Sequence, residues 1–220
     1  MAIDFEAVRA ASVAEAAATG LSISPSLPLL GAEDVAHPRP VSTVVARTRA
    51  LYGVLALREG TPLEAVLEVL RRESLLDSLS ESERRYLEAL ESGRSEEAAR
   101  IEIPLSWRTE AEYALGWALG LFDALPVTGL AGEIAPAFAP IDPDATRGGP
   151  DPALDLRPVD ELVGRLDAFY CVHWAATDHA LTASRASWPA AVVPGAVMER
   201  RHALEWIFTD EDWDEVDLST

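Results

Sequence analysis

The sequence contains no lysine and a single cysteine. Every basic residue is therefore an arginine, and Cys171 alone excludes both an intrachain disulfide and a multi-cysteine zinc site. The first ten residues, MAIDFEAVRA, lack the basic and apolar regions of a signal peptide, and the longest strongly apolar stretch, residues 114–122, is too short to span a bilayer. These absences predict a cytoplasmic protein.

Basic residues are also few, because 18 arginines stand against 37 acidic residues and the formal net charge is -19. This excess repels phosphate backbones and anionic lipid headgroups, so we expect neither nucleic acid nor a membrane as a partner. Two explanations of the acidic excess stay open. It can serve solubility in general, or it can form a surface that meets a basic protein partner.

Hydrophobic residues make up 49% of the 220-residue chain, enough for one substantial core. Strand-like alternation is nearly absent, whereas helical spacing recurs, so we predict an all-α fold in a single multi-helix domain. Two capping-box patterns mark expected helix starts, at Thr61 with Glu64 and at Ser80 with Glu83. A central helix is expected from Ser106 to Leu125, where Gly116 and Gly120 would permit close helix contact.

Two segments rich in proline and glycine divide the chain. Residues 1–40 begin with an Ala-rich helix at 4–19 and continue irregularly from 20 to 40, so we interpret them as a peripheral N-terminal arm. Residues 126–157 are expected to form a long exposed loop. The helical domain proper is predicted to span residues 41–220.

Several short motifs carry a family resemblance. They are WRTEA at 107–111, LR at 156–157, FYCVHW at 169–174, MERRHALEW at 198–206 and WDEVDLST at 213–220. Together they resemble the family known as domain of unknown function 4272, over roughly residues 41–220. The resemblance implies a mainly helical fold in a bacterial protein, and it brings no established reaction, cofactor or catalytic residue.

The two C-terminal helices contain the candidate catalytic residues. His173 shares an apolar stripe with Leu166, and Asp167 flanks that stripe beside Cys171, so a buried structural histidine is favoured over a catalytic base or metal ligand. On the last helix Glu199 and His202 form half of a Glu-x-x-His metal pattern, but a second such pair is missing. We therefore predict no bound metal and no cofactor.

Several charged residues lie in otherwise apolar neighbourhoods and should interlock, because a buried charge requires a partner. For Arg200 the candidate partners are Asp160, Asp167 and Glu110. A network that fixes helix register is favoured over one that forms the floor of a ligand pocket. The residues that we expect to bind a ligand or partner are Arg108, Arg157, Arg200, Trp213 and Asp214.

Two functions compete at this point. The leading hypothesis is a non-enzymatic protein-interaction module whose acidic C-terminal residues meet a basic protein partner, and an immunity or antagonist role would fit it. The alternative is a hydrolase-like enzyme with His173, His202, Glu199 and Asp167 around a pocket between the last two long helices. Phosphate-binding and nucleophile-elbow motifs are absent from the sequence, which supports neither an NTPase nor an α/β-hydrolase.

Overall fold

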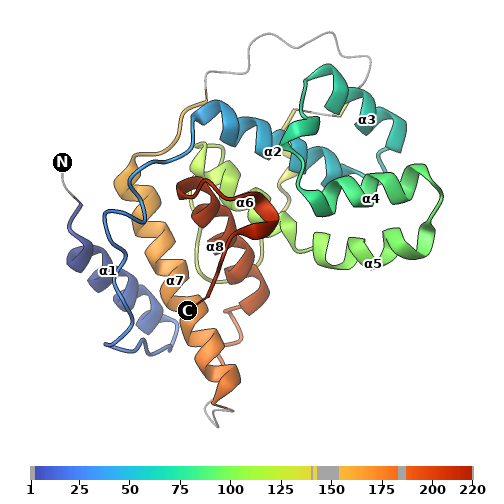
Figure 1. The fold of residues 1–220 in the computed structure, drawn as a ribbon. Coiled ribbons are helices and arrows are strands. Elements are labelled where there is room, and N and C mark those ends of the chain that lie inside the picture. Colours follow the sequence, from blue (N-terminus) through green and yellow to red (C-terminus); the bar gives the residue numbers. More distant parts are fainter. Residues whose placement is uncertain (1–2, 140, 143–153, 183–186, 220) are drawn as a thin grey trace.

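A computed structural model describes residues 3–139, 141–142, 154–182 and 187–219 (Figure 1). Eight α-helices and no strand are found in these ranges, which confirms the predicted all-α class. The helices are α1 Phe5–Ala18, α2 Val41–Ala56, α3 Leu63–Arg72, α4 Glu81–Glu91, α5 Ser95–Leu105, α6 Arg108–Ala118, α7 Val159–Leu181 and α8 Pro194–Phe208. Three short 3₁₀ turns are η1 Leu76–Ser78, η2 Ala135–Ala137 and η3 Trp213–Glu215.

The helix ends only partly follow the sequence signals. Ser80 and Glu83 form the expected capping box at the start of α4, and Gly93, with φ 67°, lies just beyond its end. The capping box expected at Thr61 is wrong, because Pro62 is the N-cap of α3 and no side chain caps that helix. Helix α5 follows after a short turn and was not expected from the sequence.

The central helix is shorter than predicted. Helix α6 ends at Ala118 because Gly120 adopts a left-handed conformation, with φ +78°, and the Leu121 N–H bonds back to the carbonyl of Gly116. A Cβ atom at Gly116 would lie 2.6 Å from the ring of Phe122. The two glycines therefore end the helix and admit an aromatic ring, which corrects the expectation of a close helix contact.

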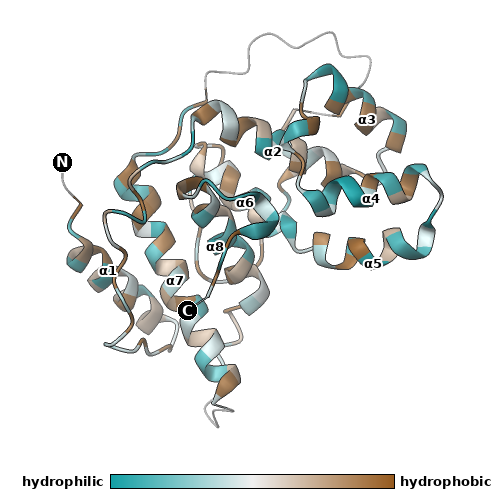
Figure 2. Ribbon diagram, viewed as in Figure 1, coloured by the Kyte–Doolittle hydropathy of each residue, from teal (hydrophilic) through white to brown (hydrophobic). Residues whose placement is uncertain are grey.

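Two hydrophobic clusters form the interior, and α2 contributes to both. One cluster gathers residues of α6, α7 and α8 with Val44 and Leu51 of α2, and the other joins α3, α4 and α5 to Ala50 and Val54 of α2. Figure 1 shows α2 reaching from the α6–α8 side to the α3–α5 side. Figure 2 shows hydrophilic residues on α4 near its start, where the two sides meet. Helices α7 and α8, which contain Leu166 and Leu204, pack extensively against each other.

The N-terminal helix lies at the edge of the molecule, alongside α7 (Figure 1). The chain then runs irregularly from 20 to 40, as predicted, while Leu27, Leu30 and Val35 bury their side chains. Residues 3–40 are therefore peripheral but firmly anchored. The domain boundary predicted at residue 40 stays a prediction. The predicted loop at 126–157 contains only the short turn η2 in its described part, and residues 140 and 143–153 lie outside the described residues.

No helix in the described ranges is both long enough and apolar enough to cross a bilayer.

Candidate functional site

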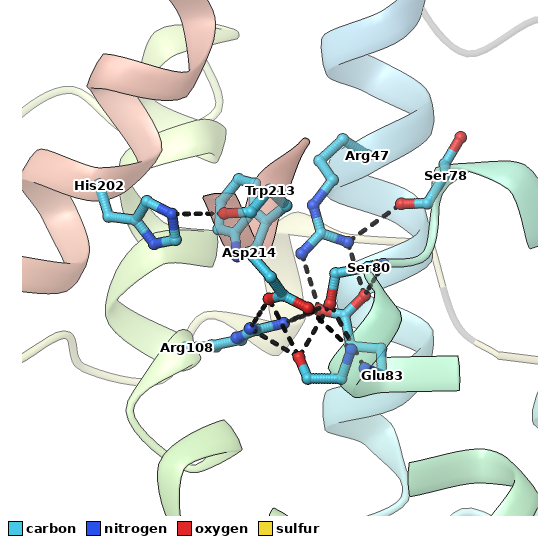
Figure 3. Close-up of polar contacts among 9 residues, drawn as sticks. Arg47, Ser78, Ser80, Glu83, Arg108, His202, Trp213 and Asp214 are labelled. Carbon is cyan, nitrogen blue, oxygen red and sulfur yellow. Dashed lines mark hydrogen bonds and ion pairs between the residues drawn. The ribbon is translucent and has the colours of Figure 1, made fainter. Parts of the chain in front are cut away.

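A buried ion cluster joins the two halves of the interior. Arg47 on α2 donates from both terminal nitrogens to Glu83 on α4, at 2.7 Å each, and Arg108 on α6 donates to the same carboxylate at 2.6 Å. Glu83 is fully buried, and Arg47 is nearly so. Figure 3 shows the three side chains converging from three helices. One carboxylate thus fixes the relative positions of α2, α4 and α6.

The local sequence explains why Glu83 can stay charged there. As the N3 residue of the capping box it also accepts a hydrogen bond from the backbone N–H of Ser80 at 3.0 Å. Burial by itself would raise the pKa of Glu83, but Arg47, Arg108 and this backbone bond hold the pKa down to about 2. The carboxylate is therefore ionised at neutral pH and fully paired.

The chain after α8, residues 209–219, folds back over this cluster, and we call this segment the C-terminal strap. Its anchor is Trp213, which is only 3% exposed, lies under the guanidinium of Arg47 at 4.0 Å and contacts the ring of Trp206. His202 lies 2.8 Å from the Trp213 carbonyl through Nε2. Trp213 was predicted as a binding residue, and the structure gives it an anchoring role.

Asp214 attaches the strap to the start of α4 (Figure 3). Its carboxylate accepts bonds from the Ser82 backbone N–H at 2.7 Å, the Ser82 hydroxyl at 3.1 Å and Arg108 at 2.5 Å. Burial opposes ionisation, yet these three donors keep the pKa of Asp214 below its usual value. Arg108 and Asp214, two predicted binding residues, thus serve first to hold the strap in place.

A cleft of about 620 Å³ lies beside the strap. The start of α4, the turn η1, α2 and the strap form its walls, and Trp206 and Trp213 contribute aromatic surface. Four acidic residues in these walls make no side-chain hydrogen bond or ion pair with any described residue. They are Asp77, Glu81, Asp212 and Glu215. Arg39, by contrast, donates to the carbonyls of Trp206 and Glu211. The cleft therefore combines these acidic groups with Arg84, Arg85 and Arg39, and Arg39 attracts Asp212 without forming an ion pair with it.

A second buried ion pair links α6 to α8. Arg200, 0% exposed, donates to Glu110 from Nε at 2.9 Å and from a terminal nitrogen at 2.6 Å. It also donates to the carbonyls of Pro126 and Gly129. Glu110 was among the predicted partners and is confirmed, whereas Asp160 is exposed at the start of α7 and was a wrong choice.

Three of the four candidate catalytic residues, Asp167, His173 and His202, are held by separate partners. Asp167 pairs with Arg9 of α1 at 2.7 Å and receives a weak bond from Cys171 at 3.9 Å, so it was also a wrong choice for Arg200. His173 contacts Arg201 through Nδ1 at 2.8 Å. No hydrogen bond joins any two of the four in the described chain, and none of them lines the cleft. The hydrolase alternative stays a prediction.

Burial shifts the pKa of three of these residues. It lowers the pKa of His173 to about 4, with help from Arg201, and lowers that of His202 to about 4 against the bond to Trp213. It raises the pKa of Glu199 to about 7, and Glu199 Oε2 lacks a protein partner. Both imidazoles are therefore neutral at pH 7, as expected of structural histidines. Across the described ranges, no three His, Cys, Asp or Glu side chains lie close enough to hold a metal ion.

Arg157 lies away from the cleft. It donates to the carbonyls of Trp117 and Phe122 at 2.8 Å each, and its guanidinium lies over the Trp117 ring at 4.9 Å. These contacts attach the beginning of α7 to the end of α6. Arg157 was predicted to bind a ligand or partner, and its donors are instead engaged within the fold.

Sequence reasoning missed three buried charged residues. Glu83 was recognised only as a capping residue, and Arg47 was not considered, although it lies one turn from Val44 and Leu51 on an apolar helix face. A lone arginine in an apolar stripe was the available signal. Glu112 is 0% exposed on α6, and neither of its carboxyl oxygens has a hydrogen-bond partner among the described residues.

The geometry defines a helical domain with an internal arginine–carboxylate network and a C-terminal strap beside a cleft. The chain belongs to the family described as domain of unknown function 4272, whose model matches residues 9–216. The match begins inside α1, well before the residues that carried the resemblance in the sequence. No curated protein and no solved structure matches the chain.

Proposed function

We propose that this protein is a non-enzymatic binding module that engages a basic segment of a protein partner through the C-terminal strap. The observation that carries the proposal is the state of the strap's charges. Four of its carboxylates, those of Asp210, Glu211, Asp212 and Glu215, are exposed and make no hydrogen bond or ion pair with any described residue. The buried arginines Arg47 and Arg108 are already paired with Glu83. Arg39 attracts Asp210 and Asp212 but makes no ion pair with them.

The strap supports binding because its backbone is already fixed. Trp213 and Asp214 hold its centre to α2, α4 and α6, so the flanking carboxylates project from an ordered support. The strap then loses less conformational entropy on binding a partner than a free acidic tail would. The cleft beside the strap adds the carboxylates of Asp77 and Glu81, which suit the guanidinium or ammonium groups of a basic segment. Arg39, Arg84 and Arg85 also line the cleft, so the strap carboxylates are the main attraction.

The proposal also agrees with the charge of the whole chain. A net charge of -19 accelerates the approach of a basic partner and disfavours acidic competitors. An immunity- or antagonist-type role, in which this domain covers a basic surface of another protein, is the biological form that we favour.

The test compares two variants that each remove four negative charges. The strap variant carries Asp210→Asn, Glu211→Gln, Asp212→Asn and Glu215→Gln. The control variant carries glutamine in place of four exposed, unpaired glutamates of α3, α4 and α5 outside the cleft lining, at positions 64, 68, 88 and 96. Both variants and the unmodified protein are used to capture partners from an extract of the source organism.

We expect one basic protein to be retained by the unmodified protein and by the control variant, and to be lost from the strap variant. Equal retention by both variants would exclude the strap as the binding surface. Loss from both variants would show that total charge, and not the strap, governs the association.

A further inference from the structure

Glu112 is a buried carboxyl group that the fold leaves unsatisfied. It is 0% exposed on α6, and both of its oxygens lack a partner among the described residues. The Nε atom of Arg47 is likewise buried and unpaired. Buried polar atoms without partners are rare in native structures because each carries a desolvation penalty.

Arg47 and Glu83 act electrostatically on Glu112, and Glu112 acts on Tyr52. Arg47 and Tyr52 belong to α2, Glu83 belongs to α4, and Arg108 lies one turn away on α6 itself. Burial raises the pKa of Glu112 well above its ordinary value, Arg47 opposes that rise, and the negative charge of Glu83 adds to it. The environment of Glu112 in this structure therefore favours its protonated form.

The two buried carboxyl groups share the arginines unequally. Glu83 has bonds from both Arg47 and Arg108, whereas Glu112 has none. If Arg47 turned toward Glu112, Glu83 would still keep Arg108. Arg47, however, also donates to the carbonyl of Ser78 and stacks on Trp213, so its movement would weaken the support of the strap.

We propose that Glu112 and Arg47 form a proton-sensitive device beneath the strap. With Glu112 protonated, Arg47 stays on Glu83 and Trp213 and the strap is closed. When Glu112 loses its proton to solvent, the new carboxylate attracts Arg47 and the strap loosens. The relevance of this device to binding rests on the proposed function, whereas its test uses the protein without a partner.

The direction of the pH effect follows from proton linkage. Because the pKa of Glu112 is higher in the closed state than in the loosened state, the closed state binds more protons between the two pKa values. Within that window the equilibrium constant for strap opening rises up to roughly tenfold per pH unit. Above the pKa of the closed state the rise stops.

The experiment measures hydrogen exchange of the strap amides, residues 209–219, from mildly acidic to mildly alkaline pH, after correction for the intrinsic rates. The unmodified protein is compared with Glu112→Gln, which cannot ionise, and with Glu88→Gln, which alters an exposed glutamate. Glu112→Met removes the same ionisable group by a different side chain and serves if the glutamine variant does not fold.

We expect the corrected opening constant of the strap to rise with pH in the unmodified protein and in Glu88→Gln, and to stay flat in both Glu112 variants. Because Glu199, with a pKa of about 7, also contributes at neutral pH, the Glu112 band is measured as the infrared carbonyl difference between the unmodified protein and Glu112→Gln, and we expect it to be present. An equal pH dependence in all variants, simultaneous loss of protection in all helices, or absence of that band would each overturn the proposal. None of these outcomes bears on whether the strap carboxylates bind a partner.

Discussion

The Arg200–Glu110 pair allows the structural account to be tested quantitatively. Arg200 is 0% exposed and donates to one carboxylate and two backbone carbonyls. Arg200→Ala would leave Glu110 buried with the Ala131 N–H as its remaining donor. The carbonyls of Pro126 and Gly129 would lose the hydrogen bonds that Arg200 donates to them. Removing one member of a buried ion pair costs roughly 3–5 kcal/mol, so we expect a loss of that size in the free energy of unfolding.

Urea denaturation followed by circular dichroism measures this change. With a slope of about 2–3 kcal/mol/M, the transition midpoint should fall by roughly 1–2 M. The matched control is Arg94→Ala, which breaks an ion pair of the same 2.6 Å length to Glu97 in which the arginine side chain is 47% exposed. That variant should lose at most about 1 kcal/mol, because exposed pairs are screened by solvent.

The double variant Arg200→Met with Glu110→Gln separates pairing from packing. It removes both charges, keeps side chains of similar length and leaves the glutamine able to accept from Ala131. Much of the lost stability should return, with a coupling energy of roughly 1–3 kcal/mol in a double-mutant cycle. An Arg200→Ala protein as stable as the original would refute the reasoning, because the buried carboxylate of Glu110 would then not need Arg200 as its partner.

Three further predictions concern the buried ion cluster, the anchor of the strap and one helix end. Glu83 has a pKa of about 2, below its unfolded value of about 4.5, so the stability that it contributes is complete above pH 4.5 and is lost as the pH falls toward 2. In acid titrations the free energy of unfolding should therefore fall less steeply for Glu83→Gln than for the unmodified protein. Trp213→Ala should lower the free energy of unfolding by roughly 3–5 kcal/mol in urea and speed exchange of the strap amides. Gly120→Ala should lower the thermal midpoint through a loss of roughly 1–2 kcal/mol at its left-handed backbone.

The sequence predicted the helical class because apolar residues at helical spacing and the capping box at Ser80 are local signals. It also predicted that Arg200 needs a buried partner and placed Glu110 among three candidates, of which Glu110 alone is the partner. It did not predict the convergence of Arg47, Glu83 and Arg108, which lie on three helices and meet only through tertiary packing.

The remaining errors have similar causes. Thr61 and Glu64 fit a capping box in sequence, yet α3 begins at Leu63 with Pro62 as its N-cap. A tryptophan near a terminus can bind a partner or anchor the chain, and the anchoring contact with Arg47 is visible only in the structure, whereas the binding role of Trp213 stays a prediction. The placement of residues 1–40 against α7 likewise depends on a distant pair, Arg9 with Asp167.

The measurement that tests the central claim most directly is a calorimetric titration of an arginine-rich model peptide into the unmodified protein, the strap variant and the control variant. Because the two variants carry the same net charge, a nonspecific attraction weakens both equally. The account predicts that the strap variant binds at least roughly tenfold more weakly than the control variant, since four exposed pairs are lost. Equal affinities for the two variants would contradict the claim that the strap is the binding surface.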